Sequence, residues 1–390
     1  MVPESEARGG SCAVIVTENV RANYITNLSL SEISGGWSGF NAAIFASLAR
    51  HYSLKYVGPI SPPPDVAAKV GSKLRRLVGL PGSFQFFSAR RLARIADEIA
   101  RAIDENAALD FFHGSTPWVA FEPRIPYACY LDASFSTYIS VYHERSRFDR
   151  ADVARIEKLE AAWLAKASRI FFSSEWALEE AARAYDLDRS TMCVAGLGGH
   201  LSIPSSDAYA GGHDFLFLSL DFAGKGGQLC VEALSELQRE IPDARLRIVG
   251  GKPPEHVLGA PGIVYEGLLS KSVPGELQGL ESILAASFAL VHPTVRDATP
   301  QVIAEAAYYG CPAIAPRSFG IPEMVVDGIT GWLVAAPPTS AEIARRMLWM
   351  CQHPSEYQAL RVATRARALR EFTWERVGDR IAEALAPVLA

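Results

Sequence analysis

The sequence predicts an α/β fold built from two doubly wound parallel-sheet domains. Its 390 residues exceed the roughly 250 to 300 that one hydrophobic core usually serves. Short apolar runs that end in small or polar residues alternate with helical patterns, as in parallel sheets covered by helices. The alternation restarts after residues 204–212, which are rich in serine, proline and glycine and are interpreted as a linker. We therefore expect domains at 1–205 and 206–371, followed by a closing helix at 372–390.

Strand-like and helical patterns follow one another through the first half. The expected strands are residues 12–17, 54–58, 109–114, 127–132 and 169–174. The expected helices are residues 39–50, 88–105, 149–167 and 177–185. This order predicts a mostly parallel sheet with helices on its faces.

The second half repeats this organisation. The expected strands are residues 215–220, 244–251, 262–267, 288–293 and 311–316, and the expected helices are 228–239, 277–286, 300–309 and 340–351. The closing helix has an apolar stripe that fits a buried face, formed by Val377, Ile381, Ala384 and Leu385. It could brace the first domain or pack within the second. Ligands bind at the carboxyl ends of parallel strands, so two such domains would form a cleft where function should be sought.

Composition and charge are those of an ordinary globular protein. Hydrophobic residues make up 49% and charged residues 21%, with a net charge of -5 and a pI near 6.0. Such a molecule has no overall positive field for nucleic acid. The six cysteines are scattered. Residues 1–10 lack a secretory signal pattern, and no apolar run reaches about 18 residues. We expect a cytoplasmic protein, which would meet a membrane only at its surface.

The segment 291–333 carries the most specific pattern. A strand-like run leads through a loop to a helix that starts at Pro300, where the free backbone N–H groups of Gln301 and Val302 could hold a phosphate. Asp297 precedes this turn, and Glu305 follows Asp297 by eight positions. Taken singly, Asp297 could be a plain helix-capping loop residue and Glu305 a solvated helix position. The ordered string of features argues for a site.

This segment resembles the nucleotide-sugar site of the retaining, two-lobed glycosyltransferases of GT-B type, the "glycosyl transferases group 1" family. Members have two acids separated by seven residues, then an alanine, a glycine-proline pair and a glycine-rich loop ending in proline-glutamate. Here these features are Asp297 and Glu305, Ala306, Cys311 with Pro312 after Gly310, and residues 320–323. The resemblance implies that Glu305 holds the ribose of the nucleotide and that Asp297 contacts the transferred sugar. Asp297 stands where most members have glutamate, and Ala298, Thr299 and Pro300 replace a glycine-rich turn. A different donor sugar, or weakened catalysis, could follow.

Further features extend the resemblance along the chain. Lys225 lies in a lysine-glycine turn that would face the donor diphosphate, although Leu220 stands where the family often has an arginine. Gly35 and Gly36 lie in a loop that would approach the donor phosphates and the acceptor. Gly199, with its neighbours 198 and 200, would line the cleft at the turn between the domains. Tight structural turns are the alternative for each glycine pair and for the lysine turn.

The first half offers acceptor-side candidates. Asp132 ends a strand near the expected reacting sugar and is a candidate base or orienting group, with a structural hydrogen bond as the alternative. His113 also ends a strand, and we interpret it as a core histidine with satisfied hydrogen bonds rather than a catalytic one. Cations concentrate in residues 69–94, where an acidic acceptor or anionic lipid could dock, although a solvated helix face is the preferred interpretation.

The resemblance implies two Rossmann-like domains, the first binding the acceptor and the second the donor. The expected reaction transfers a sugar from a UDP- or GDP-sugar to a glycan, lipid or small-molecule acceptor with retention of configuration. We expect neither a metal nor a cofactor. One alternative is a catalytically weakened or inactive nucleotide-sugar-binding partner protein of the same fold; an epimerase or phosphorylase is a minor one.

Overall fold

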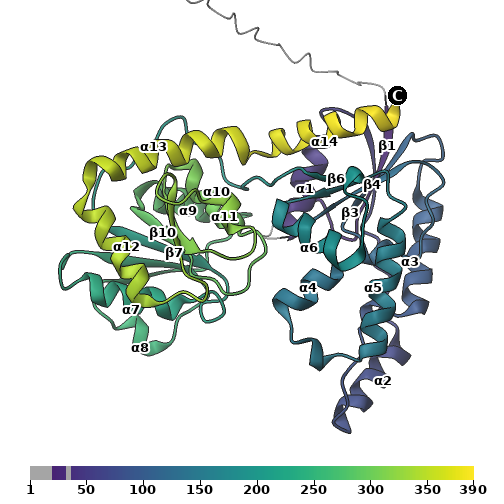
Figure 1. Ribbon diagram of the computed structural model, residues 1–390, viewed down its shortest axis with the longest axis horizontal. Coiled ribbons are helices and arrows are strands. Elements are labelled where there is room, and N and C mark those ends of the chain that lie inside the picture. Colours follow the sequence, from purple (N-terminus) through teal and green to yellow (C-terminus); the bar gives the residue numbers. More distant parts are fainter. Residues whose placement is uncertain (1–19, 32–36) are drawn as a thin grey trace, which may run out of the picture.

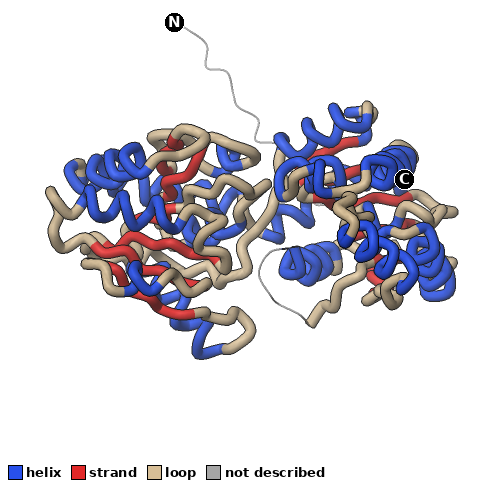
Figure 2. The backbone as a smooth tube through the Cα atoms, turned by 90° about the horizontal axis from the view of Figure 1, so that it is seen from below, coloured by secondary structure: helices blue, strands red, loops and turns tan. Residues whose placement is uncertain are grey.

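The computed structural model describes residues 20–31 and 37–390. They form two lobes, each with a central sheet flanked by helices (Figures 1 and 2). The two sheets have six parallel strands each, in the orders β2-β1-β3-β4-β5-β6 and β12-β11-β10-β7-β8-β9. This architecture confirms the predicted fold class of two doubly wound parallel sheets.

The first lobe contains strands β1 to β6 and helices α1 to α6. The strands are β1 Arg21–Ile25, β2 Ser53–Val57, β3 Leu109–His113, β4 Tyr127–Leu131, β5 Arg169–Phe172 and β6 Met192–Val194. The helices are α1 Trp37–Leu48, α2 Val66–Leu77, α3 Ala89–Ala102, α4 Phe135–Tyr142, α5 Arg150–Leu164 and α6 Glu175–Tyr185, with a 3-10 turn η1 at Gln85–Phe87. Every residue of the central strands β3 and β4 is buried, because helices cover both faces of a parallel sheet.

The second lobe follows the linker. Its strands are β7 Asp214–Ser219, β8 Arg245–Gly250, β9 Ile263–Gly267, β10 Ala289–Val291, β11 Ala313–Pro316 and β12 Gly331–Val334. Its helices are α7 Gly227–Leu237, α8 Glu255–Leu258, α9 Pro274–Ala286, α10 Gln301–Tyr308, α11 Ile321–Met324, α12 Ser340–Gln352, α13 Pro354–Glu371 and α14 Trp374–Leu389. Among the described residues, no helix combines the length and the apolar character needed to cross a membrane.

The first described strand differs from the sequence prediction. The expected strand at 12–17 lies outside the described residues, and β1 instead has the sequence RANYI, in which the polar Asn23 interrupts the apolar residues. Asn23 is fully buried in this strand, where its side-chain amide donates to Asp110 Oδ1 at 2.9 Å and to the carbonyl of Asp104 at 3.1 Å. These bonds satisfy the buried amide of Asn23, so a polar residue can occupy this interior strand. A search for apolar runs therefore does not find the strand.

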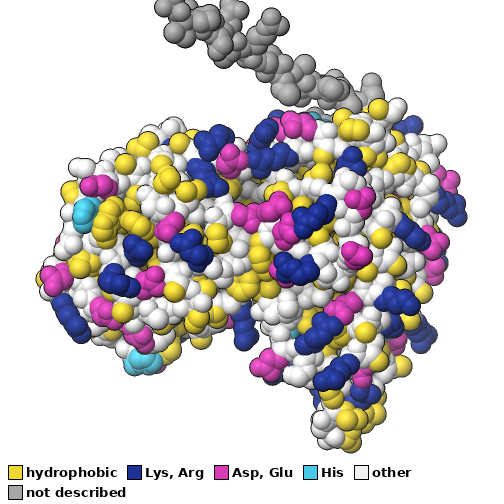
Figure 3. All heavy atoms as spheres, in the orientation of Figure 1, with side chains coloured by type: hydrophobic (Ala, Val, Ile, Leu, Met, Phe, Trp, Pro, Cys, Tyr) yellow, Lys and Arg dark blue, Asp and Glu magenta, His cyan; other side chains and the backbone are white. Residues whose placement is uncertain are grey.

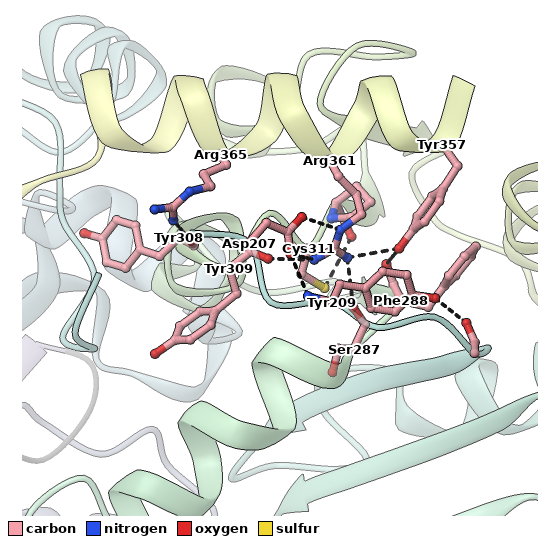
Figure 4. A network of polar contacts seen from close by, with 12 residues as sticks. Asp207, Tyr209, Ser287, Phe288, Tyr308, Tyr309, Cys311, Tyr357, Arg361 and Arg365 are labelled. Atoms are coloured by element: carbon pink, nitrogen blue, oxygen red, sulfur yellow. Dashed lines mark hydrogen bonds and ion pairs between the residues drawn. The ribbon is translucent and has the colours of Figure 1, made fainter. Parts of the chain in front are cut away.

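The linker at 204–212 is fixed to α13 by a buried arginine (Figure 4). Arg361 is 0% exposed and donates to both carboxylate oxygens of Asp207, at 2.7 and 2.6 Å. Its guanidinium also lies 4.3 Å from the ring centroid of Tyr209 and donates to the Ser287 and Tyr309 carbonyls. The segment between the domains is therefore held in place by an arginine with fully used donors.

Helix α14 crosses from the second lobe to the first and packs on α1 (Figure 1). Gly378 allows this close packing, since an added Cβ would lie 2.9 Å from atoms of Ser47. Trp374 packs edge-on against Phe40, with ring centroids 5.1 Å apart. The last helix thus contributes to the core of the first lobe.

Candidate active site

A cleft of about 1160 Å³ lies between the two lobes and is lined by residues from both. Strand ends and the loops after them supply much of its surface, in keeping with the rule for parallel sheets. Asp132, Lys225, Asp297 and Glu305 are all lining residues. The topology therefore brings together residues that lie up to 173 positions apart in the sequence.

Glu305 lies on α10 and is fully buried in the wall of the cleft. Its Oε1 accepts from the backbone N–H of His200 at 3.0 Å and from the ammonium group of Lys271. Its Oε2 is buried and has no hydrogen-bond partner. A buried carboxylate oxygen without a donor is costly, so this atom is positioned to accept from a bound molecule.

Lys271, which sequence reasoning missed, lies in the loop after β9 and also lines the cleft. Its side chain is 14% exposed. In the ion pair, the positive charge of Lys271 compensates the buried negative charge of Glu305. No spacing relates Lys271 to Glu305, 34 residues away, so only the fold reveals the pair.

The start of α10 faces the same cleft. Thr299, Pro300, Gln301 and Val302 are lining residues, and the helix begins after Pro300 with no side chain capping it. The Gln301 side chain donates to the carbonyl of Gly198 at 2.8 Å, which fixes the helix against the turn between the domains. The backbone N–H groups of this first turn are therefore available to an anion.

Asp297 is held by two cationic or hydrogen-bonding partners. Lys225 Nζ lies 2.6 Å from Asp297 Oδ2, and His292 Nε2 lies 3.4 Å from the same oxygen. Burial raises the pKa of Asp297, but the bonds from His292 and Lys225 outweigh it and lower the pKa below its ordinary value. Asp297 is therefore an anion at neutral pH. His292, at the end of the predicted strand 288–293, was not among the sequence candidates.

Lys225 stands at the turn before α7, as the sequence predicts. It also donates to the carbonyl of Arg296 at 2.6 Å, and Gly226 after it adopts a φ of 82° that favours glycine. Leu220, on the same side of the cleft, is 76% exposed and lines it. The position where an arginine would supply a second cation is thus occupied by an apolar side chain.

Asp132 lies across the cleft, just beyond β4. Burial raises the pKa of its carboxyl group to about 7, although backbone N–H groups of Asp132 and Ala133 favour the ionised form; the charge of Asp297 raises the pKa further. The two carboxyl groups therefore face each other closely enough to interact. A group that titrates near neutral pH suits proton transfer.

His113 contradicts the sequence interpretation of a core histidine with satisfied hydrogen bonds. It is 1% exposed and lines the cleft, and neither ring nitrogen has a hydrogen-bond partner. Its ring stacks on Trp37 with centroids 4.1 Å apart. Burial lowers the pKa of His113 to about 3, so the imidazole is neutral at physiological pH. The strand-end position was a signal for a site, because a neutral imidazole facing a cleft can bind a hydroxyl group.

The predicted glycines have different outcomes. Gly35 and Gly36 lie outside the described residues. Gly199 is not among the residues that line the cleft, unlike the prediction, and an added Cβ would be 2.8 Å from Glu305 Cγ and 2.7 Å from the Tyr308 ring. Its N–H donates to the Tyr308 hydroxyl at 2.8 Å. Gly199 therefore permits the close packing that positions Glu305.

Residues of the segment 291–333 connect the two lobes. The Glu323 carboxylate accepts from the backbone N–H groups of Glu175 and Trp176, at 2.6 and 2.7 Å, at the start of α6. Thr299 Oγ1 lies 2.8 Å from Ser173 Oγ, and the Tyr142 hydroxyl accepts from the N–H of Ala298 at 3.1 Å. These contacts hold the loop before α10 and the start of α11 against the first lobe.

Comparison with known proteins adds family information to this geometry. Residues 213–353 match the family model "Glycosyl transferases group 1". This chain resembles the group 1 glycosyltransferases. The matched part contains Lys225, Lys271, Asp297 and Glu305, so these charged residues of the cleft lie in the segment that matches the family model.

One curated relative of known activity shares part of the sequence. It is the GDP-mannose-dependent alpha-(1-6)-phosphatidylinositol monomannoside mannosyltransferase of Mycolicibacterium smegmatis, 32% identical over 170 residues. The match spans 41% of this chain and 44% of the relative.

Solved structures share the two-lobed fold. HepE of Anabaena, in complex with UDP, has a TM-score of 0.66 at 17% identity, covering 94% of this chain and 100% of HepE. Sucrose-phosphate synthase of Thermosynechococcus elongatus has a TM-score of 0.64 at 15% identity, covering 93% of this chain and 98% of that chain. The fold is therefore GT-B.

Within residues 20–31 and 37–390, no three His, Cys, Asp or Glu side chains lie close enough together to hold a metal ion. The cations that face the acids of the cleft are lysines instead, Lys225 at Asp297 and Lys271 at Glu305. Metal independence stays a prediction.

Proposed function

We propose that this chain is a retaining glycosyltransferase that moves a sugar from a nucleoside diphosphate sugar to an acceptor hydroxyl group in the cleft. The unpartnered Oε2 of the fully buried Glu305 is the observation that carries the proposal. A ribose offers neighbouring hydroxyl donors, which match an acceptor-only carboxylate oxygen held rigidly by Lys271 and the His200 N–H.

The start of α10 would bind the diphosphate next to this ribose position. Its free N–H groups and helix dipole favour a negative charge. Lys225 lies on the adjacent turn, where its ammonium group would stabilise the charge that develops on the departing diphosphate. Lysine is suited to this task as a compact point charge.

Asp297 would contact hydroxyl groups of the transferred sugar, held in place by Lys225 and His292. The reaction would proceed on one face of the sugar, with the leaving diphosphate taking part in removal of the acceptor proton. No covalent intermediate and no metal are needed for this route, which relies on positioning and charge stabilisation. Asp132 would orient the acceptor hydroxyl or take its proton from the opposite wall.

The sugar and the base of the donor are left open by this proposal. The mannosyltransferase relative uses GDP-mannose by its name, and HepE has been solved with UDP and UDP-glucose. Both UDP- and GDP-sugars are therefore tested first. A glycan, a lipid-linked saccharide and a small molecule all remain candidate acceptors for this step.

The first experiment measures donor binding by calorimetry with UDP, GDP and ADP. One of the three should bind, and Glu305→Gln should weaken that binding about 10- to 150-fold, because the loss of a hydrogen bond to a charged group costs about 1.5 to 3 kcal/mol. Glu232→Gln, an exposed change on α7, is the matched control and should leave binding unchanged. Equal affinity of wild type and Glu305→Gln would contradict the assignment.

The second experiment measures donor hydrolysis and transfer across a panel of UDP- and GDP-sugars and acceptors. Turnover with retained anomeric configuration, seen by NMR of the product and unaffected by a chelator, supports the transferase. Binding without turnover by the wild type would favour a partner protein that only binds the nucleotide sugar. Leu220, in place of a second cation at the cleft, is the feature that favours this alternative.

A further inference from the structure

Helix α2 is amphipathic, but its polar face packs on the rest of the lobe and its apolar face does not. Ser72 is the buried residue of this helix, and its hydroxyl donates to the Ser83 carbonyl at 3.2 Å and accepts from the Ser83 N–H at 3.1 Å. Arg75 donates to the Pro81 carbonyl and pairs with Asp149. Small and polar side chains therefore attach the helix to the rest of the lobe.

The apolar residues of α2 face solvent instead. Val66, Val70, Leu74 and Leu77 have the spacing of one helical stripe, and they are 72%, 51%, 58% and 72% exposed. Val78 and Leu80, just after the helix, are 72% and 50% exposed and extend the stripe. A continuous exposed apolar surface of this kind marks an interaction site, whereas single exposed residues do not.

Cations border this stripe. Lys69 and Lys73 lie on the same helix, exposed, and no ion pair is found for either among the described residues. Residues 65–94 contain seven lysines and arginines and a single acid, Asp65, whose carboxylate caps the start of α2. Hydrophobic and basic side chains gather at the lower tip of the molecule in Figure 3, where Figure 1 places α2. The face is therefore both apolar and positive, and it is exposed to solvent in this structure, as the sequence interpretation of a solvated helix face expects.

The surface continues toward the cleft through aromatic residues. The 3-10 turn η1 packs against α2. Phe86 and Phe87 of this turn, with Phe84 before it, line the acceptor side of the cleft together with Tyr138. Phe86 is 52% exposed and Tyr138 is 42% exposed. An apolar path thus joins α2 to the wall opposite Glu305.

We propose that residues 66–80, which we call the α2 arm, dock on an anionic lipid surface, and that the acceptor is a lipid-linked molecule that enters the cleft along the aromatic wall. The second part rests on the proposed function. A surface that combines exposed Val and Leu with unpaired Lys fits the interface of an anionic bilayer, where apolar side chains insert and cations meet lipid headgroups. The whole chain has a net charge of -5, so the attraction comes from this arm and not from overall charge.

The docking test is co-sedimentation of the full chain with vesicles of phosphatidylcholine alone and with 30 mol% phosphatidylglycerol. Binding should require the anionic lipid. Lys69→Gln with Lys73→Gln should weaken it about 25-fold, at about fivefold for each cation near the surface. Lys158→Gln with Lys166→Gln, two exposed lysines elsewhere in the same lobe, is the matched control and should bind as wild type does.

The apolar contribution is tested with Val70→Ser, Leu74→Ser and Leu77→Ser combined. These side chains are exposed, so the variant should fold, and circular dichroism checks this. Vesicle binding should fall at least tenfold, whereas Val362→Ser, at an exposed site on α13, should change nothing. Unchanged binding of the triple variant, or no binding of the wild type to anionic vesicles, would overturn the docking proposal. So would a dimer in light scattering that the triple variant converts to a monomer, since a second copy would then cover the arm.

The acceptor part has its own readout. Once a donor is known, transfer to lipid extracts in vesicles should fall at least tenfold in the triple variant, while calorimetric nucleotide binding and donor hydrolysis stay at the wild-type level. Equal transfer to lipid by both proteins would refute the acceptor assignment. If the wild type binds no nucleotide, the proposed function is refuted instead. Vesicle binding is measured without any donor, so its result does not depend on the proposed function.

Discussion

Replacing Asp132 tests whether the cleft holds a carboxyl group whose pKa is raised by burial. Burial raises its pKa from 3.8 to about 7. An acid with a raised folded pKa favours the protonated folded state, so its ionisation destabilises the fold as pH rises from about 4 to 7. The rise corresponds to about 4 kcal/mol, since one pKa unit is about 1.4 kcal/mol. Asp132→Asn keeps an oxygen acceptor for the Ala133 N–H but removes the charge.

The expected result is therefore a pH-dependent stabilisation. The free energy of unfolding of Asp132→Asn should exceed that of the wild type by about 4 kcal/mol at pH 8 and by roughly 2 kcal/mol at pH 5. Urea unfolding followed by tryptophan fluorescence measures both values. Transfer activity should change in the opposite direction, falling about 10²- to 10⁴-fold if the carboxylate acts as a base. Wild-type activity should then rise with pH up to about 7, and the variant should lack that rise.

Two outcomes would refute this reasoning. A stability difference that is the same at pH 5 and pH 8 would show that Asp132 does not titrate with a raised pKa. A loss of stability at both values would show that the carboxylate makes structural hydrogen bonds that Asn cannot replace. Retained activity with a gain in stability would leave Asp132 without a role in proton transfer and would support the leaving diphosphate as the base.

Three further substitutions probe other parts of the structure. Lys225→Ala should lower kcat about 10²- to 10³-fold, measured by donor turnover, while the exposed Lys252→Ala should not; equal rates would contradict the role at the leaving group. His113→Phe should leave thermal stability unchanged or higher, because it removes two buried ring nitrogens that have no hydrogen-bond partner, yet it should lower transfer at least tenfold; lost stability with full activity would indicate a structural histidine. Arg361→Met should lower unfolding free energy by about 3 to 5 kcal/mol in urea, unlike the exposed Arg370→Met on the same helix, and equal losses would refute the linker anchor.

The sequence predicted the sheets well where strands are continuous apolar runs. Strands β3, β4, β5, β7, β8, β10 and β11 all overlap the predicted ranges, because most of their residues are buried on both faces; the partly exposed β9 overlaps its predicted range as well. Strand β1 was missed, since Asn23 is compensated by partners 81 and 87 residues away that no local pattern indicates. Helix α2 was expected only as a solvated helix face within the basic residues 69–94, without bounds. Its exposed apolar stripe was not predicted, because tertiary packing decides whether such a stripe faces inward or outward.

The candidate site divides along a similar line. Lys225, Asp297 and Glu305 occupy turn and helix positions with short-range signals, and the structure brings them to one cleft. Lys271 and His292 complete the charge pairs but belong to no spacing rule. The lack of hydrogen-bond partners for the His113 ring nitrogens depends on the residues around it in the fold. The sequence pattern of a histidine at a strand end is the same whether or not such partners are present.

Helix α14 affects the order in which the two lobes can complete their folding during synthesis. Its residues Trp374 and Gly378 complete a core whose other members, such as Phe40 and Ser47, lie more than 300 positions earlier. On the ribosome, the first lobe therefore emerges with an uncovered apolar face and must wait while the whole second lobe is synthesised. That interval, at about 5 to 20 residues per second, is on the order of ten seconds or more. Chaperones would find their binding surface on α1 during this time, and it should disappear once α14 docks.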